Sequence, residues 1–109
     1  MTNIAKLTAE LERRIIETAL DAMLATGYEV SVEHDLPYVV LEASRDRAAI
    51  LDALFSESGA EFLVLRAPAG GSRGWVQFKE GNGSDVIIDF TPVLKTTLAA
   101  ANKLAEDYS

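Results

Sequence analysis

The feature that most constrains the fold is an abrupt change in the spacing of apolar residues at Gly27. Before this glycine, apolar residues recur every three or four positions, which places them on one stripe of a helix. They are Ile4, Leu7, Leu11, Ile15, Ile16, Leu20, Met23 and Leu24. After it, residues 28–33 alternate between apolar and polar, the pattern of a strand with one solvated face. We therefore expect a helix from about residue 8, or slightly earlier, to residue 26, with Thr8 as a plausible cap and Glu12 on the outer side. A strand should follow it at once.

In the rest of the chain, segments with the apolar spacing of a strand again alternate with segments that have the spacing of a helix. A second strand is expected over residues 38–43 after a turn at 34–37, and Ser44 is a plausible cap for a helix that ends near Ser58. Three more strands are expected over residues 61–66, 75–79 and 85–90. They are separated by a flexible connection at 67–74 and a Gly/Asn-rich hairpin turn at 80–84. Thr91 followed by Pro92 predicts the capped start of a last helix that runs to about Asp107.

The order α-β-β-α-β-β-β-α predicts one α+β domain over residues 1–109. Short turns require antiparallel neighbours, so we expect a mostly antiparallel five-stranded sheet with the helices packed on one face. The second face would then be uncovered, and simple alternation would place Val39, Leu41, Leu63 or Leu65 on it. An apolar face of this kind normally finds a partner, which makes a homodimer the expected assembly.

Composition excludes several classes of protein. The chain has 109 residues, a formal net charge of −7 and no cysteine. A disulfide framework is therefore impossible, and a nucleic acid or an anionic membrane is a poor partner for so acidic a chain. No apolar run approaches the roughly 20 residues of a membrane span, and the amino terminus does not resemble a signal peptide. We expect a cytoplasmic protein.

Six residues are the candidates for a ligand site or an interface: His34, Asp35, Tyr38, Arg73, Trp75 and Asp89. The one histidine, His34, could act as a general base beside a carboxylate, but a histidine that ends a strand is the more ordinary interpretation. Trp75 near Arg73 is typical of an interface anchor, and a core position at the start of a strand is an equally good interpretation of this tryptophan.

Other chemistry finds no support in the sequence. Ser72 lies in a glycine-rich segment that precedes a strand, whereas a nucleophile elbow or a phosphate-binding loop precedes a helix. Asp85 and Asp89 share one face of a strand at roughly 13 Å, too far apart for one ion. The segment at 81–85 lacks the spacing of a calcium loop. We therefore expect no metal, no cofactor and no catalytic residue.

The last quarter of the chain resembles a group of small uncharacterised bacterial and phage-type proteins. The residues that carry the resemblance are Gly81-Asn82-Gly83-Ser84-Asp85-Val86-Ile87-Ile88-Asp89-Phe90, followed by a helix. These proteins end in a Gly-Asn-x-Gly-x-Asp-Val-Ile-x-Asp-aromatic hairpin and helix. The resemblance implies a small accessory protein and transfers no catalytic residue.

Three functions remain open at this point. The first is a non-catalytic interaction or regulatory module that self-associates. The second is a small-molecule binder or small enzyme with a pocket between sheet and helices, and the third is an acidic decoy that mimics nucleic acid. Residues 28–59 carry two basic and seven acidic side chains, whereas residues 60–109 carry five and six. The nearly neutral final hairpin and helix are therefore the expected surface for self-association.

Overall fold

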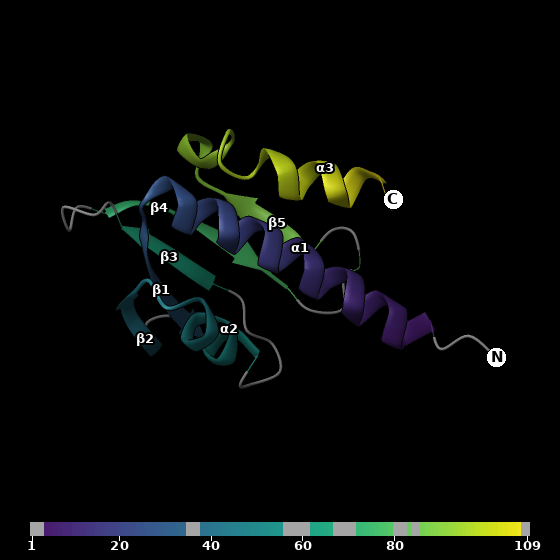
Figure 1. The fold of residues 1–109 in the computed structure, drawn as a ribbon, viewed down its shortest axis with the longest axis horizontal. Helices are drawn as coiled ribbons and strands as arrows, with labels where there is room; N and C mark the ends of the chain where they lie inside the picture. The colour runs from purple at the N-terminus through teal and green to yellow at the C-terminus, as the bar shows by residue number, and fades with distance from the viewer. Residues whose placement is uncertain are drawn as a thin grey trace.

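Helices and strands follow one another along the chain in the expected order (Figure 1). The computed structural model describes residues 4–34, 38–55, 62–66, 72–79, 83 and 86–107, with the side chains of 9–33, 41–55, 74–79, 83 and 86–107. The elements are α1 (Ile4–Thr26), β1 (Glu29–His34), β2 (Tyr38–Ser44), α2 (Arg47–Phe55), β3 (Phe62–Arg66), β4 (Ser72–Phe78), β5 (Ile87–Phe90), a 3-10 turn η2 (Pro92–Leu94) and α3 (Ala99–Asp107). The α+β class predicted from the sequence is confirmed.

The strands pair antiparallel in the order β2-β1-β3-β4-β5, so β2 and β5 form the two edges. Residues that pair directly across antiparallel strands share a face of the sheet. One cross-strand row joins Glu33, Phe62, Gln77 and Asp89, and the next joins Ser31, Val64 and Trp75. These rows lie on the outer face, because the intervening Val32 and Val76 are fully buried.

This register corrects the residues expected on the outer face. Leu41 pairs with Val32 and packs against the core. Positions 63 and 65 pair with the fully buried Val32 and Val30, so their rows are those of the inner face. Position 39 pairs with Glu33 and so belongs to an outer row. The simple alternation failed because the face that each residue takes depends on the register of its strand with the neighbouring strands. The sequence of a single strand does not determine that register.

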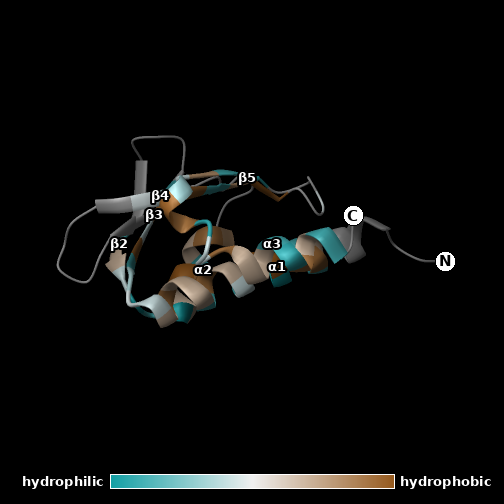
Figure 2. Ribbon diagram, turned by 90° about the horizontal axis from the view of Figure 1, so that it is seen from above, coloured by the Kyte–Doolittle hydropathy of each residue, from teal (hydrophilic) through white to brown (hydrophobic). Residues whose placement is uncertain are grey.

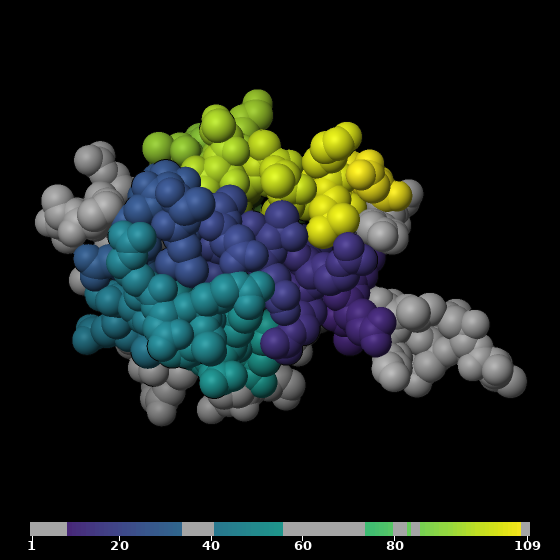
Figure 3. Space-filling view, viewed as in Figure 1, coloured from purple at the N-terminus to yellow at the C-terminus, as the bar shows by residue number. Residues whose placement is uncertain are grey.

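All three helices lie on the same side of the strands, as Figure 2 shows. In the space-filling view α1 lies between α2 and α3 (Figure 3). Side chains from this helical layer and from the inner face of the sheet form one buried cluster. It comprises Ile15, Ile16, Ala19, Leu20, Met23, Val30, Val32, Ile50, Leu51, Ala53, Leu54, Val76, Phe78, Val86, Leu94, Leu98 and Ala101.

The carboxyl end of α1 is closed by glycine and by an arginine from a distant segment. Gly27 has φ +101° and donates its N–H to the Leu24 carbonyl, a glycine-terminated helix end of the expected kind. The Arg45 guanidinium donates to the carbonyls of Leu24 and Gly27 at 3.3 and 3.2 Å. A cation at a helix carboxyl terminus is favoured by the helix dipole, so Arg45 supports the turn from α1 into β1.

The caps predicted for the first two helices are wrong. Thr8 lies inside α1, which begins at Ile4. At α2 the cap is Asp46, whose Oδ1 accepts the N–H groups of Ala48 and Ala49 at 3.0 and 3.3 Å. The Ser44 hydroxyl instead accepts the Asp46 N–H at 3.0 Å. Serine and aspartate two residues apart both suit a helix start, and the sequence pattern does not choose between them. The predicted end of this helix at residues 58–59 lies outside the described residues.

Candidate functional site

The last hairpin and the turn that follows it carry the most distinctive exposed side chains of the described residues. Trp75 and Gln77 alternate with the buried Val76 and Phe78 and are themselves half-buried. On the neighbouring edge strand Asp89 is exposed and Ile88 is 40% exposed, while Val93 on η2 is 60% exposed. Ile88 and Val93 are the exposed large apolar side chains within the described part of the chain. We call these five residues (Trp75, Gln77, Ile88, Asp89 and Val93) the β4–β5 surface.

The backbone of Trp75 is fixed by the residue that follows β5. The Thr91 hydroxyl accepts the Trp75 N–H at 2.8 Å and donates to the Trp75 carbonyl at 3.1 Å. The Thr91 N–H donates to the same carbonyl at 3.0 Å. The expectation that Thr91 caps a helix with its side chain is therefore wrong, because its hydroxyl is engaged across the hairpin. These bonds give Trp75 a rigid support, which suits an anchor at an interface.

Asp89 lies in β5, within the strand expected over residues 85–90. Its Oδ1 accepts the N–H of the next residue, Phe90, at 2.9 Å. The strand has an irregular register at this point, because Gln77 pairs with Asp89 while Phe78 pairs with Ile87. Ile88 is thus an extra residue in β5, a bulge, and this explains its exposure.

Of the remaining candidates, those with described strand positions do not lie together in the sheet. His34 and Tyr38 are Cα partners at one end of the β1–β2 pair, and Asp35 lies outside the described residues, as do the side chains of His34, Tyr38 and Arg73. Arg73 belongs to β4, which begins at Ser72, so the expected loop at 67–74 is partly strand. Ser72 aligns through Arg66 with Glu29, the opposite end of β1 from His34. The strand positions of His34 and Arg73 therefore lie at opposite ends of the sheet.

Sequence reasoning missed Glu12. We expected it on the outer side of α1, but it is 5% exposed, and its Oε2 accepts the Gly83 N–H at 2.7 Å. The signal was present in the spacing, because residue 12 precedes Ile15 and Ile16 by three and four positions and so shares their stripe. A buried carboxylate needs such a partner, and this bond joins α1 to the turn between β4 and β5.

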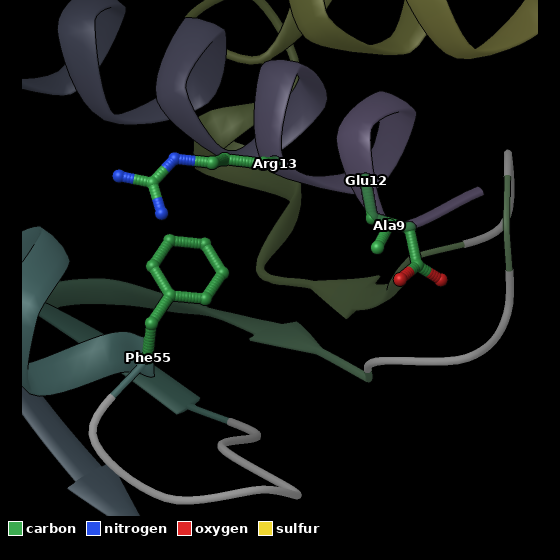
Figure 4. A pocket seen from close by; sticks show the side chains of 4 residues that line it. All are labelled: Ala9, Glu12, Arg13 and Phe55. Atoms are coloured by element: carbon green, nitrogen blue, oxygen red, sulfur yellow. The ribbon is translucent and has the colours of Figure 1, made fainter. Parts of the chain in front are cut away.

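A small hollow of about 210 Å³ lies beside Glu12 and is lined by Ala9, Glu12, Arg13 and Phe55. The Arg13 guanidinium carbon stands 4.7 Å from the centre of the Phe55 ring, a cation–π contact. In Figure 4 the Glu12 carboxylate points away from this pair. In a ligand site the polar groups converge on a common point. The polar side chains of Glu12 and Arg13 that line this hollow do not.

Arg13 also belongs to a line of ion pairs between α1 and α2. Its Nε contacts Glu17 at 2.8 Å, and Glu17 and Asp21 contact Arg47 of α2 at 3.3 and 2.7 Å. The hydrogen bond with Asp21, followed by the charge of Asp21, raises the pKa of Arg47 above its ordinary value. These side chains are substantially exposed to solvent, so each ion pair adds little to the stability of the fold.

Within the described ranges, no three His, Cys, Asp or Glu side chains are arranged to hold a metal ion. None of the helices in that part of the chain is both long enough and apolar enough to cross a membrane. Comparison with protein-family models, with curated proteins and with solved structures finds no match. The resemblance of the last quarter to small bacterial and phage-type proteins therefore stays an expectation.

Proposed function

We propose that this protein is a non-catalytic interaction module that self-associates, and that its interface is the β4–β5 surface. The observation that supports the proposal most is that α1, α2 and α3 all lie on the same side of the sheet. This arrangement leaves the outer face of the sheet without helical cover at the strand that holds the single tryptophan of the chain. Ile88, at the bulge of the edge strand β5, adds exposed apolar area next to this strand, and Val93 adds more on η2, beside Gly74. Aromatic and branched apolar side chains on rigid strands are typical of the centre of an interface.

The charge distribution supports a second copy as the partner. Residues 60–109, which supply the β4–β5 surface, are nearly neutral, whereas residues 28–59 carry most of the excess acid. Two copies that meet through this surface keep their acidic halves apart and so avoid most of the mutual repulsion. A twofold dimer uses one patch on both copies and needs no other complementary surface.

The test is sedimentation of the purified chain over a range of concentrations, with Trp75 emission recorded on the same samples. We expect reversible dimerisation, together with a blue shift of the emission, because Trp75 is the one tryptophan and it leaves water in the interface. Ile88→Glu should weaken dimerisation by at least about tenfold, since it places a charge in an apolar contact.

The matched control is Ala100→Glu, which adds the same charge at an exposed position of α3. Dimerisation and emission should be unchanged in this variant. A wild-type chain that sediments as a monomer at every concentration would contradict the proposal. So would a dimer that Ala100→Glu and Ile88→Glu weaken equally.

A further inference from the structure

Asn82 is followed by glycine, and this pair of residues has a spontaneous chemistry of its own. The backbone nitrogen of the residue after an asparagine can attack the asparagine Cγ. Glycine hinders this attack least, because it has no side chain. Of the three asparagines in the chain, Asn3 precedes isoleucine and Asn102 precedes lysine. The pair at 82–83 is therefore the place in this sequence where the reaction is expected to be fastest.

The reaction needs only water besides the chain itself. As the Gly83 nitrogen bonds to the Asn82 Cγ, the Cγ–Nδ2 bond breaks, and the side-chain NH2 group leaves as ammonia with the proton that the Gly83 nitrogen gives up. Water then adds to one of the two carbonyl carbons of the resulting succinimide. The products are aspartate and isoaspartate, and in isoaspartate the backbone gains one methylene group. Either product adds a negative charge at neutral pH.

The nitrogen that would attack is held by α1. The Gly83 N–H donates to the Glu12 Oε2 at 2.7 Å, and Glu12 is 5% exposed. The Gly83 carbonyl is also engaged, because it accepts the Val86 N–H at 3.2 Å. Asn82 itself lies outside the described residues, and the structure shows the nitrogen that its reaction requires.

The Glu12 carboxylate opposes the reaction on electrostatic grounds. The nitrogen attacks after it has lost its proton, and a carboxylate within hydrogen-bonding distance disfavours a second negative charge there. Burial strengthens this effect, because little water screens the two groups. A carboxylate is also far too weak a base to remove an amide proton. Glu12 therefore protects the nitrogen of Gly83 and does not activate it.

We propose that Asn82 is a spontaneous modification site, and that Glu12 slows its conversion to aspartate and isoaspartate while the protein is folded. The bond joins residues 71 positions apart in the sequence, so the protection belongs to the folded chain. Separation of α1 from the turn between β4 and β5 would release the nitrogen. The modification would then leave a permanent covalent record of that opening. This inference does not depend on self-association.

The test compares rates of modification at residue 82, measured by mass spectrometry of the peptide that contains it, at neutral pH. Wild type unfolded in urea gives the unprotected rate. We expect folded wild type to react at least about tenfold more slowly, the effect of one hydrogen bond to a charged group. Glu12→Ala should remove most of this protection. Glu12→Gln keeps an acceptor oxygen without the charge, so its rate should lie between those of wild type and Glu12→Ala.

Ile50→Val is the control for a general loss of stability, because it removes a buried methylene group of α2 and leaves the bond to Gly83 in place. Hydrogen exchange of the Gly83 amide reports the loss of that bond independently. We expect Glu12→Ala to raise both the exchange rate and the modification rate, and Ile50→Val to leave both near the wild-type values.

Three results would overturn the inference. One is a folded wild type that reacts as fast as the unfolded chain. Another is a Glu12→Ala chain in which Gly83 exchanges faster but residue 82 reacts no faster. The third is equal acceleration by Ile50→Val and Glu12→Ala, because unfolding of the whole chain would then control the rate.

Discussion

At the scale of single residues, Ala43 in β2 stands out as the non-glycine residue with a positive φ within the described part of the chain. Its φ of +42° lies in the left-handed region, which alanine adopts at a cost of roughly 1 kcal/mol. The register explains the conformation, because Val30 pairs with Ser44 and Val32 with Leu41, so β2 carries an extra residue. The Ala43 N–H is taken up by the buried Ser31 hydroxyl at 2.9 Å. No alternation of residue types indicates this bulge in the sequence.

Ala43→Gly is expected to stabilise the protein by about 0.5 kcal/mol or more, because glycine adopts a positive φ without the clash of a Cβ. The measurement is the free energy of unfolding in urea. Ala48→Gly, at an exposed position of α2, is the matched control and should cost about 1 kcal/mol. A destabilisation of similar size in both variants would show that Ala43 is not strained.

At the scale of elements, β4 and η2 approach each other closely at Gly74. A Cβ added to Gly74 would overlap the Thr91 hydroxyl and would approach Val93 Cγ1 to 3.3 Å. This requirement explains why a glycine occupies residue 74 of β4, a position where the sequence predicts a loop. The glycine is needed because another element passes close to it, and its pairing with Leu65 continues β4.

Gly74→Ala is expected to cost about 1–3 kcal/mol, since the Thr91 hydroxyl must leave the backbone of Trp75 to make room. The check is a double-mutant cycle with Thr91→Ala, read by urea unfolding and by Trp75 emission. Thr91→Ala removes the obstructing hydroxyl, so the double variant should lose less than the two single losses combined. Additive losses would mean that Gly74 is required for another reason.

At the scale of the whole molecule, sequence periodicity predicts the helices and strands but not the contacts between distant ones. The helix that ends at Thr26 and the strands around Val30 and Val76 follow from patterns within each segment. The bond from Glu12 to Gly83 spans 71 residues, and the phase of β3 depends on its two neighbours. Pairings between distant segments are properties of the assembled fold, so the Gly83 partner of Glu12 and the composition of the β4–β5 surface became visible only there.

Substitution of Glu12 therefore tests how much the hydrogen bond between α1 and the last hairpin contributes to the stability of the fold. Glu12→Ala leaves the Gly83 N–H without its acceptor, and we expect a loss of about 1.5–3 kcal/mol, the range for a hydrogen bond to a charged group. Glu12→Gln keeps an acceptor oxygen and should lose less, and Glu10→Ala, at an exposed position of the same helix, should change little.

Urea unfolding measures the three losses, and hydrogen exchange of the Gly83 amide locates the effect. Because the bond holds the turn of the hairpin against α1, Glu12→Ala should also speed exchange at Lys79, whose N–H donates to the Val86 carbonyl at 2.8 Å. Equal losses in the Glu10 and Glu12 variants, with Gly83 exchange unchanged, would show that the hairpin is held by the apolar core alone.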